Sequence, residues 1–226
     1  MKPLKTMLLL IAASVIAATA AQAAPFQNGS FEDGPGPVKS GNSAAWVTTL
    51  GVGDTRLAGW TIGSGDIDYM DTDFWQAAAG QHSLDMSGTQ AGTIAQTFDT
   101  VAGASYTVTF SLAGNPDGGA PATKTLRVAA TGGPATDYSV TPSGNSTSNM
   151  GWADQTYSFT ASGSSTTLSF TSLAASNSGP ALDDVRVVAG VTGTPALSAP
   201  TLSTWAMLGL VALLVGIALR KRRVTG

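Results

Sequence analysis

The stretch that decides the fold is Ser105-Tyr-Thr-Val-Thr-Phe-Ser-Leu112, near the middle of a chain of 226 residues. Apolar and hydroxyl-bearing side chains alternate along it, with the two-residue period of a strand that buries one face. Threonine and aromatic residues are also the residue types that strands prefer. The stretch therefore predicts a β-strand with one face in a hydrophobic core.

The same alternation recurs on both sides of this stretch, and no segment between Phe26 and Val187 shows a helical period. Turn sequences separate the repeats, among them Asn115-Pro-Asp-Gly-Gly119 and Pro142-Ser-Gly-Asn145. About eight short strands in one domain predict an all-β fold, a jelly-roll β-sandwich. The other predicted strands are Gly92–Phe98, Thr123–Ala129, Gln155–Thr160, Thr166–Thr171 and Leu182–Val188.

Composition and charge exclude several classes of protein. Charged residues make up 11% of the chain, where roughly a quarter is usual, and there is no cysteine to form disulfides. Residues 24–188 hold five basic and fourteen acidic residues, a net charge of −9. Such a surface repels phosphate backbones, so we expect no nucleic acid partner.

The first 23 residues have the three parts of a secretory signal peptide. Lys2 and Lys5 form a positive start, Met7–Ala18 is apolar, and Ala21-Gln-Ala23 is a small-x-small cleavage site. We therefore expect an exported protein whose mature chain begins at Ala24. The β-sandwich domain is predicted to span residues 24–188.

The C-terminal part has the pattern of a membrane anchor. An uncharged linker, residues 189–199, precedes a predicted sorting and anchor segment, residues 200–226. Residues 202–219 form an apolar run of about 18 residues, enough for one transmembrane helix. Trp205 would lie at the outer interface and Arg220-Lys-Arg-Arg223 would stay in the cytoplasm. The pattern fits either a permanent tail anchor or a sorting signal that a membrane protease cuts.

The start of this segment, Pro200-Thr-Leu-Ser-x-Trp205, resembles the Ile-Pro-Thr-Leu type of C-terminal sorting domain, with Ala199 in place of the usual Ile. The same three-part design occurs in the Pro-Glu-Pro signals that exosortases process in Gram-negative bacteria. The resemblance implies a Gram-negative source and a sorting protease of the exosortase type as a partner. It also implies a protein that is membrane-anchored at the cell envelope or released after processing.

Motifs spread along residues 26–188 carry a second resemblance. They include Asn28-Gly-Ser-Phe-Glu32, Gly59-Trp-Thr61, Phe110–Asp117, Asn149-Met-Gly-Trp152 and Gly179-Pro-Ala-Leu-Asp183. In this order they resemble the bacterial choice-of-anchor C family, which is related to the plant cell-wall family named domain of unknown function 642. The resemblance implies a galactose-binding-like jelly roll, the fold of many carbohydrate-binding modules. It implies no catalytic mechanism.

The same resemblance names residues for a metal. In galactose-binding-like modules the first and last strands are neighbours, and a carboxylate near each often holds a structural Ca²⁺ through hard oxygen ligands. Glu32 and Asp183 are the predicted calcium ligands, with Asn28 as a third. The alternative is that Asp183 accepts hydrogen bonds from a turn and that no metal binds. The four aspartates between Asp66 and Asp73 fit a solvated strand edge or a second calcium site.

Aromatic residues are the predicted carbohydrate-binding site. Tyr69, Trp75 and Trp152 could stack on the apolar faces of pyranose rings, or else lie in the core or anchor loops. Trp60 is predicted to be core. No carboxylate spacing marks a glycosidase pair, His82 is the only histidine, and no Gly-x-Ser-x-Gly elbow precedes a helix.

The function predicted from these observations is a non-catalytic, exported surface protein that binds carbohydrate, with a polysaccharide or envelope component as partner. The alternatives are a structural or adhesive protein of the envelope or biofilm matrix, and a glycoside hydrolase.

Overall fold

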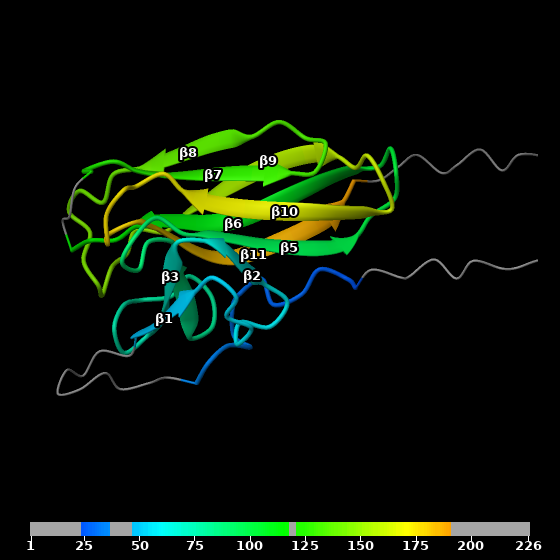
Figure 1. Cartoon of the computed structure of the whole chain (residues 1–226). Helices are drawn as coiled ribbons and strands as arrows, with labels where there is room; N and C mark the ends of the chain where they lie inside the picture. Colours follow the sequence, from blue (N-terminus) through cyan, green and yellow to red (C-terminus); the bar gives the residue numbers. More distant parts are fainter. Residues whose placement is uncertain (1–23, 37–46, 118–120, 191–226) are drawn as a thin grey trace, which may run out of the picture. The chain divides into compact units, whose positions relative to one another are not determined.

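The computed structural model describes residues 24–36, 47–117 and 121–190, which form eleven strands in two facing sheets (Figure 1). Strands pair antiparallel in both sheets. The described residues contain no helix, hence none long and apolar enough to cross a membrane. The prediction of an all-β sandwich is confirmed. The predicted signal peptide, the anchor segment and most of the linker lie outside the described residues.

The six strands of one sheet and the five of the other interleave along the chain. The six-stranded sheet has the order β1 (Val47–Gly51), β3 (Asp66–Asp71), β4 (His82–Asp85), β11 (Pro180–Ala189), β6 (Ser105–Gly114) and β9 (Ala153–Thr160). The five-stranded sheet has the order β2 (Thr61–Ser64), β5 (Thr93–Asp99), β10 (Ser165–Ser172), β7 (Lys124–Ala130) and β8 (Thr136–Val140).

All six segments predicted from alternation are strands, with ends that differ by no more than two residues. For β3, a solvated strand edge was one of two interpretations of its aspartates. The strands β1, β2, β4 and β8 were not predicted. Each has only four or five residues, so each places two or three side chains on a face, which is too few to show a period. The packed unit of the chain runs to Val188, so the domain has a core of its own.

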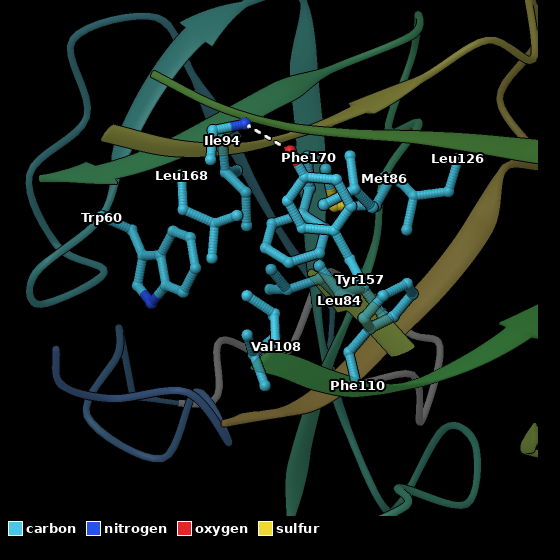
Figure 2. Close-up of a cluster of buried hydrophobic side chains, with 14 of the residues drawn as sticks. Trp60, Leu84, Met86, Ile94, Val108, Phe110, Leu126, Tyr157, Leu168 and Phe170 are labelled. Atoms are coloured by element: carbon cyan, nitrogen blue, oxygen red, sulfur yellow. Dashed lines mark hydrogen bonds between the residues drawn. The ribbon is translucent and has the colours of Figure 1, made fainter. Parts of the chain in front are cut away.

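The main core fills the space between the sheets (Figure 2). Ile94 and Phe170 from the five-stranded sheet meet Leu84 and Val108 from the six-stranded sheet, and all four are fully buried. Trp60 is 4% exposed and its ring centroid lies 6.1 Å from that of Phe170, so its predicted place in the core is confirmed. Removing one large side chain of this kind typically costs about 3–5 kcal/mol.

A second apolar cluster lies on the outer face of the six-stranded sheet. Because side chains alternate along β3, Tyr69 faces the main core and Met70 faces outward. Met70 packs with Trp75, Ala113, Met150 and Ala181, and Val47, Phe74 and Trp152 are partly buried around them. Two connections supply the cover: the β3–β4 loop (residues 72–81) and the β8–β9 loop (residues 141–152).

The N-terminal segment is held against the last strand without forming a strand itself, whereas the first strand, β1, is separated from β11 by β3 and β4. The amide of Val185 donates to the carbonyl of Gly29 at 2.8 Å. A Cβ at Gly29 would lie 1.8 Å from the Val185 carbonyl oxygen, so only glycine fits there. Phe31, two residues later, is fully buried at a φ of 59°, a backbone strain that its burial in the core offsets.

Candidate functional site

Two carboxylates hold the second half of the β3–β4 loop. Asp183 Oδ2 accepts hydrogen bonds from the amides of Ala78 and Ala79, at 2.8 and 2.9 Å. Glu32 Oε1 accepts from the amides of Gln81 and His82, both at 2.9 Å. The loop is therefore anchored to the N-terminal segment and to β11, by two of the residues that the sequence singled out.

These contacts do not fit the predicted calcium site. Asp183 Oδ1 also accepts from the amide of Asp184 at 2.6 Å, so both oxygens of Asp183 face N–H donors. Asn28 donates to the carbonyls of Asp33 and Ala58 and accepts from the amide of Asp33. In the described parts of the chain, no group of three or more His, Asp or Glu residues is placed to hold a metal ion. Calcium binding stays a prediction from sequence, while the geometry fits loop anchoring.

Tyr69 and His82 form the base of the same loop. His82 Nδ1 lies 3.1 Å from Glu32 Oε2, and Nε2 lies 3.3 Å from Asp71 Oδ2 without hydrogen-bond alignment. The His82 ring stacks on Tyr69 with centroids 4.8 Å apart. Tyr69 is 2% exposed and donates to the carbonyl of Phe31, and burial raises its pKa above the ordinary value. The prediction that Tyr69 stacks on a sugar is wrong, because its ring faces the core.

Trp75 is also buried, at 1% exposed, and its Nε1 donates to Ser83 Oγ at 2.7 Å. The predicted sugar-stacking role of Trp75 is therefore wrong as well. The outer face of the six-stranded sheet carries Met70, Ala113 and Ala181, and Trp75 packs in one cluster with them. For Trp75, the structure fits the alternative role given above, which is to anchor a loop.

Trp152 is half-buried, and the β3–β4 loop fixes its ring. Its Nε1 donates to the carbonyl of Gln76 at 2.8 Å. The amide of Gln76 donates to the carbonyl of Thr147 at 2.8 Å, and Gln76 Oε1 accepts from the amide of Met150 at 3.3 Å. Gln76 thus joins the β3–β4 loop to the β8–β9 loop at three points. Of the three aromatic residues predicted from sequence, only Trp152 keeps part of its ring in solvent.

Phe74 is a second half-buried ring on the same cluster, and it was not predicted. Among the described residues no aromatic ring is fully exposed, and the half-buried ones are Phe26, Phe74, Tyr138 and Trp152. Only Phe74 and Trp152 of these four pack on the second cluster. We call Phe74, Gln76 and Trp152 together the Phe74–Trp152 surface. The sequence feature that could have indicated Phe74 is its position next to Trp75 in an acidic stretch.

A buried polar network lies elsewhere, near the ends of β4 and β6. Asn115 Nδ2 donates to Asp85 Oδ2 at 2.7 Å, and the amides of Ser87 and Gly179 donate to Asp85 Oδ1. Burial raises the pKa of Asp85 to about 7. Burial also lowers the pKa of Lys124, which is fully buried, and the charge of Asp85 raises the pKa of Lys124 by a smaller amount. Asp68 is the cross-strand neighbour of Asp85, but Asp85 is 1% exposed and out of reach of a substrate.

One open depression of about 360 Å³ is lined by Thr89, Gln90, Ala91, Ala175 and Ser176. Asp66 shapes its rim, since its carboxylate accepts from the amides of Thr89 and Gln90. No aromatic side chain lines it.

The family comparison matches residues 24–188 to a family described as Protein of unknown function (DUF642). Halomucin of Haloquadratum walsbyi is 30% identical over 165 residues, which is 72% of this chain. The chain spans 2% of the length of that relative.

Among solved structures, TmCBM61 in complex with β-1,4-galactotriose is 14% identical, with a TM-score of 0.41, and the match covers 73% of this chain and 97% of that one. A CBM35 from Paenibacillus barcinonensis is 18% identical, with a TM-score of 0.42, and covers 63% and 99%. A family 35 carbohydrate binding module from Clostridium thermocellum is 14% identical, with a TM-score of 0.40, and covers 64% and 92%. Likeness at this level says nothing about a ligand of this chain.

Proposed function

The chain belongs to the DUF642 family, and we propose that its residues 24–188 form a non-catalytic carbohydrate-binding domain. The observation that carries the proposal is the Phe74–Trp152 surface. It presents two half-buried aromatic rings from two loops on one apolar cluster. Aromatic rings with a few fixed polar groups beside them are typical of small-ligand sites.

The hydrogen bonds of the two loops support this role because they fix the rings before a ligand arrives. Trp152 is held by the carbonyl of Gln76, and Gln76 is held by Thr147 and Met150. A site on ordered loops avoids the entropic cost of ordering them on binding, which leaves more of the contact energy for affinity.

Three carboxylates that are engaged inside the described domain support a role without catalysis. Glycoside hydrolysis needs two carboxyl groups that flank the scissile bond, about 5–10 Å apart and accessible to the substrate. Glu32 and Asp183 accept hydrogen bonds from loop amides, and Asp85 is buried and accepts a hydrogen bond from Asn115. None of these three is placed as an acid or a base for a bound sugar.

The two ends of the sequence support a proposal about location. The predicted signal peptide would export the domain, and the Pro200-Thr-Leu-Ser-x-Trp205 segment with its basic tail would hold it at a Gram-negative cell envelope. The domain would then be a choice-of-anchor C protein, with a sorting protease able to release it. Its ligand would be a polysaccharide or another component of the envelope.

One observation favours a second candidate, a structural or adhesive protein of the envelope or matrix. The outer face of the five-stranded sheet carries cross-strand hydroxyl pairs in place of aromatic rings. Thr97 and Thr167 are 2.8 Å apart, Thr125 and Ser139 are 2.9 Å apart, and Ser64 donates to Thr93 at 3.0 Å. A regular polar face of this kind could contact another protein or a second copy of the chain.

Glycan binding by the purified 24–190 fragment tests the first proposal. We expect binding to at least one polysaccharide on a glycan array, with Kd measured by calorimetry. Because the rings supply most of the contact area, Trp152→Ala and Phe74→Ala should each weaken binding at least tenfold. Val101→Ala, an exposed position away from both loops, is the matched control and should bind normally. Binding to no glycan, or binding that Trp152→Ala leaves unchanged, would refute the proposal.

A further inference from the structure

We infer that the Phe74–Trp152 surface selects neutral glycans and rejects glycans that carry carboxylate or sulfate groups. The inference rests on the proposed function and adds the chemical class of its ligand. It depends on two features of the described residues: where the carboxylates lie relative to the two rings, and how the cations are used.

An exposed carboxylate lies beside each ring. Asp73 immediately precedes Phe74, and its amide donates to Asp71 Oδ1 at 2.9 Å, which fixes the turn. Asp154 follows Trp152 by two residues and accepts a hydrogen bond from Ser111 Oγ at 3.2 Å. Consecutive Cα atoms are 3.8 Å apart, so each aspartate has its Cα within about 8 Å of the Cα of its aromatic neighbour. An anionic sugar on the rings would meet negative charge from the β3–β4 loop and from the start of β9.

The exposed cations of the described residues are already paired. Arg56 contacts Asp54 at 2.6 Å, Arg127 binds Asp137 through two hydrogen bonds, and Arg186 contacts Asp184 at 2.7 Å. Proteins recognise carboxylate and sulfate groups best with the fork of an arginine side chain. Each arginine fork in this part of the chain is occupied by an aspartate.

The two lysines of residues 24–188 are Lys39 and Lys124. Lys124 is fully buried in the described structure and cannot reach a ligand. Lys39 lies outside the described residues and is the one residue whose contribution needs its own control.

The other polar groups near the rings are neutral. Gln76 lies on the surface itself, and Ser148 and Asn149 are exposed in the β8–β9 loop beside Met150. Amides and hydroxyls pair with sugar hydroxyls without charge. The combination of apolar rings, neutral donors and acceptors, and flanking carboxylates therefore suits an uncharged pyranose.

A matched pair of polymers tests the inference. One probe is the neutral polysaccharide that the 24–190 fragment binds best, and the other is the same polymer oxidised at C6 to the uronate. Titrations run with EGTA, so that calcium cannot bridge two carboxylates. We expect the oxidised polymer to bind at least tenfold more weakly at 50 mM salt, and the difference to shrink at 500 mM salt as charge is screened.

Charge variants locate the effect. Asp73→Lys combined with Asp154→Lys should bring the two affinities within about threefold, in line with the removal of flanking repulsion. Asp99→Lys makes half of this change in charge, on the other sheet, and should leave the discrimination intact. Thermal unfolding of each variant checks that it is folded.

The outcomes separate the two proposals. Tighter binding of the oxidised polymer, or of natural uronate or sulfate polymers, would overturn this inference while leaving carbohydrate binding in place. The inference would also be overturned if the protein bound the anionic polymers more tightly and Lys39→Ala removed that binding. Binding to no polymer at all would overturn the proposed function, and this inference with it.

Discussion

At the scale of single residues, burial decides the role of each aromatic and acidic side chain. Tyr69, Trp75 and Trp152 look alike in the sequence, because each has polar neighbours and could stack on a sugar. Only the fold distinguishes them. Tyr69 faces the main core and Trp75 covers the outer face of a sheet, whereas Trp152 keeps part of its ring in solvent. The residues that bury Trp75 come from β3, β6 and β11, so no local pattern could reveal them.

Two buried carboxyl groups make the stability of the protein depend on pH. Burial raises the pKa values of Asp85 and Asp183 from 3.8 to about 7. The folded state therefore binds more protons than the unfolded state between about pH 4 and pH 7, and stability falls as pH rises through that window. Carboxylates with a lowered pKa, such as Asp66, lose their contribution only below about pH 4.

We therefore expect the free energy of unfolding to be highest near pH 4 and to fall by about a few kcal/mol between pH 5 and pH 8. Urea denaturation at pH 5, 6.5 and 8 measures it. Asp85→Asn and Asp183→Asn should each flatten the dependence, because each removes one titrating group. A wild-type protein that is equally stable at pH 5 and pH 8 would contradict the two raised pKa values.

At the scale of elements, alternation predicts a strand when one face is buried and the other is solvated. It succeeds for β6 up to Phe110 and for β10, where buried and less buried residues alternate. It fails for β4, where three of four residues are buried, because the second cluster covers the outer face as well. The β3–β4 loop could not be predicted as ordered, since its anchors Glu32 and Asp183 lie 49 and 104 residues away from the amides they bind.

The anchoring of the β3–β4 loop predicts how Asp183 contributes to stability. Asp183→Ala removes the acceptor of three backbone amides, at a cost of about 2–3 kcal/mol. Asp183→Asn keeps one carbonyl acceptor and should cost less. We expect EGTA to leave the Tm of the wild-type protein unchanged, because the carboxylate oxygens face N–H groups. A drop in Tm on chelation that Asp183→Ala abolishes would instead support the calcium prediction.

At the scale of the whole molecule, a β-sandwich with a loop-borne aromatic surface follows a predicted export signal and precedes a predicted anchor in the sequence. The all-β class could be predicted, because motif order and alternation extend over the whole domain. The two-loop origin of the Phe74–Trp152 surface could not. It depends on β3 and β9 lying on opposite sides of β4, β11 and β6 in one sheet.

The most direct test of carbohydrate binding at this surface is a titration of the ¹⁵N-labelled 24–190 fragment with a glycan that it binds, followed through the indole N–H signals. The described residues contain three tryptophans, and each Nε1 donates to a different acceptor: Trp60 to Asn28, Trp75 to Ser83 and Trp152 to Gln76. We predict that the Trp152 signal and the amides of the β3–β4 and β8–β9 loops shift, while the Trp60 indole signal stays in place. Shifts centred on another face, with the Trp152 indole unmoved, would contradict the account.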